Sequence, residues 1–238
     1  MAYDLISVLP LSRVVDCKRQ YIMCAIGHVC TTDDVEGKMQ FFVLVQRIEN
    51  DSWTEFFPQS AIFGAAPKCN ICGAYEGQRR WAPPYRADLQ TWGNRFGDIA
   101  FGGVDILVSE AFRDACHAAK LVGLSSFDNV EIVHYRGRKR ISGVPPRYLK
   151  IDIPLGSTAI DELASGVEWD GIACKRCLLG INLKRRRNIT INEKTWSGDD
   201  VFFARGVPGQ IIVSLNFKLM CESFCLSNAF FVPAENRR

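Results

Sequence analysis

The sequence predicts an α+β fold in which short helices pack on an antiparallel sheet. Short runs rich in β-branched and aromatic residues recur along the chain, and such runs are typical of buried strands. Two of these runs end in a serine that precedes a helical pattern, as an N-cap would. The same order of motifs occurs twice, which indicates two tandem repeats, each a cysteine pair followed by strand, helix and strand.

The composition is that of a globular protein. Of 238 residues, 47% are hydrophobic and 23% are charged, and no window approaches the roughly 18 consecutive apolar residues of a membrane span. The first residues lack the basic and apolar regions of a secretory signal, so we expect a cytoplasmic protein without a membrane partner. The net charge of +3 is too small to require a nucleic-acid or membrane partner by long-range attraction.

Residues 1–38 differ from the rest of the chain, because they show mixed polarity, no sustained period and a polar run at residues 31–38. Residues 39–45 then form a dense apolar run, so we expect a single domain over residues 39–238. Residues 1–38 are either a disordered N-terminal arm or a mis-assigned start. The second alternative fits the codons of residues 35–38, which can spell a ribosome-binding sequence just before Met39.

Strands and helices are predicted in order along this domain. The predicted strands are residues 39–45, 106–108, 130–135, 148–153, 211–213 and 230–232. Ser109 and Ser214 are expected to cap the helices that come after them. The first helix is expected to end near Gly123, with the glycine in a left-handed conformation.

An internal repeat relates the two halves of the domain. Residues 106–116 align with residues 211–221 at an offset of 105, and the same offset carries Cys69 onto Cys174 and Cys72 onto Cys177. Agreement of two separate motifs at one offset favours duplication, with halves at about residues 67–135 and 172–236.

Two CxxC motifs carry the main chemical signal. Cys69 and Cys72, followed by Gly73, form one tight turn, and Cys174 and Cys177 form the other. Four thiolates predict a structural Zn²⁺ site that joins distant parts of the chain and leaves no open position for catalysis. A thioredoxin-like dithiol or plain buried cysteines are the alternatives, but neither explains the duplication.

The remaining reactive side chains indicate no catalytic site. Cys116 and Cys221 lie at equivalent helix positions of the repeat, and Cys225 lies one turn beyond Cys221, so all three are interpreted as buried core residues. Cys17, Cys24 and Cys30 have no metal spacing. His28, His117 and His134 lie in no recognisable motif, and neither capping serine lies in a G-x-S-x-G elbow. We therefore predict no catalytic residue, no bound organic cofactor and no enzyme.

Two basic runs, residues 136–140 and 184–187, could contact phosphate or an acidic protein surface. A nucleic-acid interface is the weaker interpretation, because the aromatic residues lie within apolar strand patterns and form no evident stacking platform. A zinc-ribbon nucleic-acid-binding or regulatory protein stays open as the alternative function.

The chain resembles the double-CxxCG motif family, which comprises immunity proteins of bacterial polymorphic toxin systems, known especially from myxobacteria. The likeness covers residues 39–235 and rests on the two cysteine motifs, the strand–serine–helix segments, residues 200–203 and the closing strand. One departure is Leu178, where the family has glycine, so the second turn is expected to differ. The resemblance implies a protein that binds and neutralises a cognate toxin.

Overall fold

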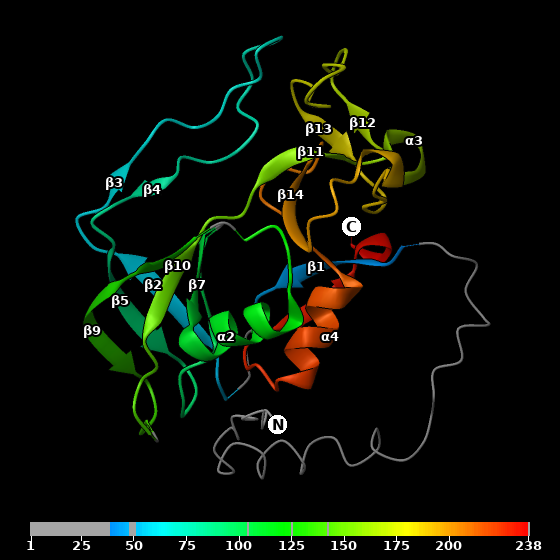
Figure 1. The fold of residues 1–238 in the computed structure, drawn as a ribbon. Helices are drawn as coiled ribbons and strands as arrows, with labels where there is room; N and C mark the ends of the chain where they lie inside the picture. Colours follow the sequence, from blue (N-terminus) through cyan, green and yellow to red (C-terminus); the bar gives the residue numbers. More distant parts are fainter. Residues whose placement is uncertain (1–38, 48–50, 104, 125, 142, 238) are drawn as a thin grey trace, which may run out of the picture. The chain divides into compact units, whose positions relative to one another are not determined.

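Two β-sheets and the helices that pack against them make up most of the part of the chain that the computed structural model describes (Figure 1). The described residues are 39–47, 51–103, 105–124, 126–141 and 143–237. The residues from Met39 onward form a compact unit by themselves. The prediction for residues 1–38 lies outside the described residues. The α+β class is confirmed, with many strands and few helices.

The first sheet has five strands, with β1 near its centre. In spatial order the strands are β11 (Leu155–Ala159), β14 (Val201–Arg205), β15 (Ile211–Ser214), β1 (Phe41–Val45) and β16 (Phe230–Pro233). Strand β1 pairs antiparallel with both β15 and β16, so the predicted N-terminal strand joins the C-terminal half of the chain.

The second sheet has seven strands and belongs to the first half of the domain. In spatial order they are β8 (Phe127–Asn129), β10 (Tyr148–Ile151), β7 (Asp105–Ser109), β6 (Ile99–Gly102), β2 (Thr54–Pro58), β5 (Arg86–Thr91) and β9 (Glu131–Gly137). Two small ladders complete the described strands: β3 (Ile62–Phe63) pairs with β4 (Trp81–Ala82), and β12 (Glu168–Trp169) pairs with β13 (Leu183–Arg185).

The expected antiparallel pairing holds for most of the strand pairs, but not for all of them. Strands β11 and β14, β2 and β6, and β5 and β9 pair in parallel, so both large sheets are mixed. The local apolar pattern predicts each strand but carries no information on its partner, because pairing direction depends on the path of the connections.

The helices are short, and the two longest lie side by side. They are α2 (Glu110–Ala119), α3 (Glu162–Ser165) and α4 (Leu215–Ser223), with 3₁₀ turns η2 (Glu193–Thr195) and η3 (Ala234–Asn236). Figure 1 shows α2 and α4 next to one another. The ring centroids of Phe112, on α2, and Phe217, on α4, lie 5.8 Å apart. Both rings are fully buried in a core to which both large sheets contribute, so the two halves share one hydrophobic core.

Matching hydrogen bonds begin α2 and α4, as the capping prediction required. The hydroxyl of Ser109 accepts the N–H three residues later at 3.1 Å and donates to Asp98 at 2.6 Å. The hydroxyl of Ser214 likewise accepts at 3.2 Å and donates to Asp200 at 2.5 Å. Each serine is therefore fixed by a helix terminus and a carboxylate, which explains its position without a catalytic role.

The predicted end of the first helix is wrong by one turn. Helix α2 ends at Ala119, and Lys120 takes the left-handed cap with φ of 54°, its N–H donating to the carbonyls of Cys116 and His117. Gly123 also has a positive φ, of 97°, but for a different reason. A Cβ there would lie 2.7 Å from the carbonyl oxygen of Val201, so this glycine allows close packing on β14.

Strand β10 is confirmed, but all four of its residues are buried, including Lys150. The ammonium group of Lys150 contacts the carboxylate of Asp152 and donates to the carbonyl of Ile151 at 3.2 Å. The alternating pattern of this segment therefore does not mark a solvent-facing side, since a buried charge is tolerated when it is paired.

Candidate metal centre

The first cysteine pair lies in the long connection between β3 and β4. Figure 1 shows this connection, residues 64–80, reaching away from the seven-stranded sheet toward the β12–β13 hairpin. At its turn, the N–H of Cys69 donates to the backbone carbonyl of Ala74 at 2.8 Å, and the N–H of Gly73 donates to the backbone carbonyl of Cys69 at 2.9 Å. Gly73 has φ of 74°, a left-handed conformation that glycine adopts without steric cost.

The second cysteine pair lies beyond β12 and forms the same kind of turn. The N–H of Cys174 donates to the backbone carbonyl of Leu179 at 3.0 Å, and the N–H of Leu178 donates to the backbone carbonyl of Cys174 at 2.8 Å. Leu178 occupies the position of Gly73 and has φ of 59°, so the expected difference in this turn is not found. A left-handed leucine costs about 1–2 kcal/mol. Packing of its side chain against a buried cluster offsets part of that strain.

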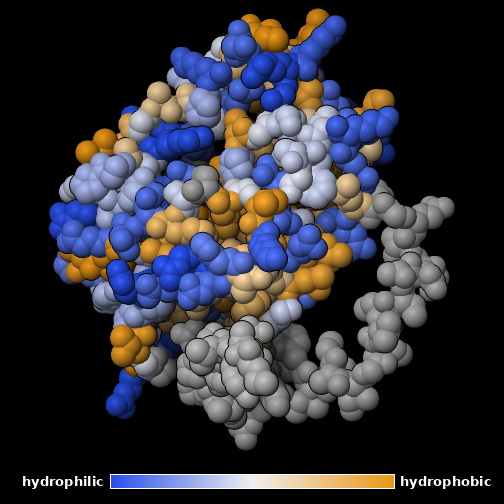
Figure 2. All heavy atoms as spheres, in the orientation of Figure 1, coloured by the Kyte–Doolittle hydropathy of each residue, from blue (hydrophilic) through white to orange (hydrophobic). Residues whose placement is uncertain are grey.

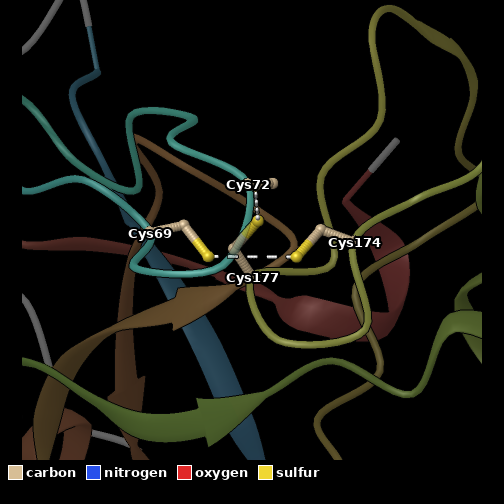
Figure 3. Close-up of side chains that lie close together, drawn as sticks. All are labelled: Cys69, Cys72, Cys174 and Cys177. Carbon is tan, nitrogen blue, oxygen red and sulfur yellow. Dashed lines mark hydrogen bonds between the residues drawn. The ribbon is translucent and has the colours of Figure 1, made fainter.

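The four thiols converge on one point, as Figure 3 shows. The sulfur atoms of Cys69 and Cys174 lie 3.8 Å apart, and those of Cys72 and Cys177 lie 3.6 Å apart. All four sulfurs lie within 4.8 Å of one another, and none of the four cysteines is in a disulfide. A tetrahedral ion with metal–sulfur bonds of about 2.3 Å requires sulfur–sulfur distances of about 3.8 Å. The predicted residues could therefore hold a metal ion.

The turns themselves favour ionised sulfur at the first cysteine of each pair. The backbone N–H groups of Cys177 and Arg176 lower the pKa of Cys174 to about 6. The N–H groups of Cys72 and Ile71 lower the pKa of Cys69 in the same way. Burial, in contrast, raises the pKa of Cys177 to about 12. A bound cation would overcome that burial effect, because metal-coordinated thiols are deprotonated.

The donor set also limits what this centre can do chemically. Soft thiolates in a tetrahedral arrangement suit Zn²⁺ or an iron–sulfur centre, not Mg²⁺ or Ca²⁺. Four protein ligands would fill the coordination sphere of Zn²⁺ and leave no position for water or substrate. The geometry therefore fits a structural metal that staples residues 64–80 to the β12–β13 hairpin.

The other cysteines fall into three groups. Cys116 and Cys221 are buried in the shared core, as expected, and burial raises the pKa of Cys116 to about 12. Cys225 is exposed after the end of α4, so its interpretation as a core residue is wrong. The helix ends two residues earlier, at Ser223, which removes Cys225 from the buried helical face. Cys17, Cys24 and Cys30 lie outside the described residues.

Sequence reasoning missed a polar cluster on β5 and β9. The ring nitrogen Nδ1 of His134 lies 2.9 Å from the buried carboxylate of Asp88, which Arg136 also contacts at 3.2 Å. The parallel pairing of β5 with β9 creates this contact between residues 46 positions apart, so no local motif signals it. His117 is exposed on α2, its ring 5.6 Å from that of Phe127, and His28 is not among the described residues.

The two basic runs differ in how far intramolecular contacts occupy them. In residues 136–140, Arg136 pairs with Asp88, and the guanidinium of Arg138 lies 3.5 Å above the ring of Trp92. In residues 184–187, Lys184 pairs with Asp170 at 2.7 Å. Arg185 and Arg187 are exposed beside the β12–β13 hairpin. Lys139 and Arg140 of the first run are exposed as well, so both runs present basic side chains to a partner.

Comparison with known proteins adds no assignment. No protein-family model matches this chain, and no curated protein matches it. Among the described residues, no helix combines the length and apolar character that crossing a membrane requires.

Proposed function

We propose that Cys69, Cys72, Cys174 and Cys177 hold one Zn²⁺ ion per chain and that this ion is structural. The observation that carries the proposal is the convergence of four thiols, all within 4.8 Å of one another, from two turns 105 residues apart. Zinc is the ion that four-cysteine tetrahedral sites most commonly hold as a structural element.

The same geometry supports a duplicated origin for the two halves. Cys69 with Cys174 and Cys72 with Cys177 each face one another at the 105-residue offset of the sequence repeat. Both turns share a left-handed residue after the second cysteine, and both later helices share a serine cap bonded to a carboxylate. A zinc knuckle followed by strand, helix and strand is the proposed repeat.

On this framework we infer that the protein is an immunity protein that binds and neutralises a cognate bacterial toxin. Support comes from the resemblance to the double-CxxCG motif family, which includes both cysteine motifs and both strand–serine–helix segments. A closed thiolate site leaves no open position at the metal for chemistry on a toxin. Protection would therefore act by direct, stoichiometric binding in the cytoplasm of the producing cell, and the protein would not be an enzyme.

Elemental analysis of the purified protein tests the metal. We expect about one zinc per chain, and we expect Cys69→Ser combined with Cys174→Ser to lose it, because one ligand is removed from each turn. Cys116→Ser, which changes a buried cysteine of the shared core, is the matched control and should retain zinc. Iron in place of zinc, or full zinc retention in the double variant, would refute the proposed ion or its ligands.

Co-expression tests the immunity function. Cells that express a toxin encoded beside this chain should survive only when this protein is also present, and the two proteins should co-purify in a 1:1 ratio. For an inhibitor that must act at low abundance we expect nanomolar affinity, or about −12 kcal/mol. Equal killing with and without this protein, and no co-purifying toxin, would contradict the proposal.

A nucleic-acid-binding protein is the second candidate. The observation that favours it is the basic charge around the cysteine turns: residues 66–80 and 168–187 contain nine Lys and Arg but three Asp and Glu. Retention on DNA or RNA that falls steeply with salt would support this candidate, since phosphate contacts release counterions.

A further inference from the structure

The surface that surrounds the cysteine cluster is unusually apolar for an exposed region. Ile172 is 97% exposed, Ile181 is 81% exposed and Ile71 is 71% exposed. A single exposed apolar residue needs no explanation, but three exposed isoleucines on the two segments whose cysteines converge indicate an interaction surface.

Each of these isoleucines lies within four residues of one of the converging cysteines. Ile71 lies between Cys69 and Cys72, whose sulfurs meet those of the second turn. Ile172 and Ile181 lie on either side of the second turn, and the Cδ1 atom of Ile181 lies 3.7 Å from where a Cβ on Gly171 would be. Leu183 and Tyr75, 46% and 59% exposed, lie further along the same two segments. We call these five residues the knuckle patch.

Figure 2 shows hydrophobic residues set among hydrophilic ones at the end of the view where Figure 1 places the β12–β13 hairpin and the connection between β3 and β4. The charged residues of that region are mostly basic. Lys68, Lys175, Arg176 and Arg185 are all exposed on the two segments that carry the patch. These segments have a net charge of +6, although the whole chain has +3, so the basic charge of the protein is concentrated here.

We propose that the knuckle patch is the surface by which this protein binds its toxin, and that the toxin presents an apolar centre rimmed by acidic residues. The proposal rests on the proposed immunity function. An apolar centre with a charged rim is the usual anatomy of a specific protein interface. The basic rim would attract an acidic partner and raise the association rate.

The patch favours a protein over a nucleic acid. Single-stranded nucleic acids bind to aromatic side chains on which bases stack, whereas four of the five residues of this patch are aliphatic and only Tyr75 is aromatic. Isoleucine contributes to binding by burial of apolar area, which a complementary protein surface provides.

The metal centre gives this surface its rigidity. Within residues 64–80 the one buried residue is Cys69, and within residues 170–188 it is Cys177. The cysteines are therefore the buried anchors of the two segments, which backbone hydrogen bonds and the partly buried Leu178 also hold in place. A surface fixed before binding loses less conformational entropy when the partner arrives, so a structural metal would increase affinity for the toxin.

The experiment measures binding of the catalytically inactivated product of the adjacent toxin gene to wild-type protein and to four variants. Ile172→Asp and Ile181→Asp each introduce an acidic group into the patch and should weaken binding at least 100-fold. Val144→Asp is the matched control, because Val144 is also an aliphatic residue, 93% exposed, but lies on the loop before β10. It should change affinity less than twofold. Ile181→Ser keeps the test valid if an aspartate reduces zinc content, and it should weaken binding at least 10-fold.

Two further measurements separate the outcomes. Removing the metal with a chelator should abolish toxin binding by the wild type, and raising the salt from 50 to 300 mM should slow association. If the wild type binds the toxin and the patch variants bind equally well with zinc retained, the knuckle patch is refuted while the immunity function stands. If the wild type binds no toxin but binds DNA or RNA in a salt-sensitive manner, both proposals fail.

Discussion

Removing the metal proposed for the four cysteines should open two surface segments while the shared core stays folded. The perturbation is chelation, or Cys174→Ser, which removes one of the four converging thiols. Residues 64–80 and 170–188 each contain a single buried residue, a cysteine in both cases. The three buried hydrophobic clusters of the described residues draw on other segments, apart from the partly buried Leu178. A metal held by these cysteines would therefore be a local staple and not a support of the whole fold.

The expected size of the effect comes from comparing the interactions that hold residues 64–80. A structural zinc site contributes about 10–16 kcal/mol in small peptides. The backbone hydrogen bonds within this segment, such as Gly64 to Arg80 at 2.9 Å and Glu76 to Pro67 at 3.0 Å, contribute about 1 kcal/mol each. Ordering each residue opposes them by about 1–2 kcal/mol. Without the metal, these hydrogen bonds are too weak to keep the segment closed.

Hydrogen exchange measured by mass spectrometry provides the assay. Amide exchange in residues 64–80 and 170–188 should rise at least 100-fold after chelation, while β1, β7 and β15 remain protected. Cys116→Ser, in which the metal ligands are intact, should leave both segments protected. Unchanged exchange in residues 64–80, or simultaneous loss of protection in the three central strands, would refute this account.

Three further predictions concern the core. Phe112→Ala and Phe217→Ala should each lower the free energy of unfolding by about 3–5 kcal/mol in urea titrations. The double variant should lower it by less than the sum of the two, because the ring centroids lie only 5.8 Å apart. Additive effects would mean that the two halves have independent cores. Gly123→Ala should lower the free energy of unfolding by about 2 kcal/mol or more, because the new Cβ would lie 2.7 Å from the carbonyl oxygen of Val201. Gly103→Ala is the control: Gly103 has φ of 76° but open space around it, so this change should cost only about 1 kcal/mol. Equal melting temperatures of the two variants would contradict the clash at Gly123. Burial raises the pKa of Cys116 from 9.0 to about 12, so the folded state prefers the neutral thiol. The contribution of this thiol to stability is complete below pH 9 and is lost between pH 9 and 12 at about 1.4 kcal/mol per pH unit. If a Cys116→Ala variant loses stability above pH 9 in the same way as the wild type, Cys116 is not the cause of that loss.

The sequence predicts those parts of the fold whose signal is local. Ser109 and Ser214 are recognisable as caps because a serine between an apolar run and a helical pattern has one physical use there. The four cysteines are recognisable because metal ligands need specific side chains at specific spacing, and the repeat relates the two pairs. The site residues could thus be predicted without knowledge of any strand pairing.

Features that depend on distant contacts could not be predicted in this way. The position of Gly123 fits a helix cap, but its actual role is set by Val201, which approaches from another strand. The contact of His134 with Asp88 exists only because β9 pairs in parallel with β5. The exposure of Ile172 and Ile181 is likewise invisible in the sequence, where an isoleucine beside a cysteine motif predicts burial.

The long separation between the two cysteine turns has a consequence for synthesis on the ribosome. Cys72 precedes Cys174 by about 100 residues, and translation at about 5–20 residues per second makes the second turn roughly 5–20 s after the first. During that interval the first turn offers only two thiols, which is half of a coordination sphere. Metal capture by all four cysteines would therefore be a late event, possible only after both cysteine turns have left the ribosome. A nascent chain truncated before residue 174 should bind zinc far more weakly than the full chain.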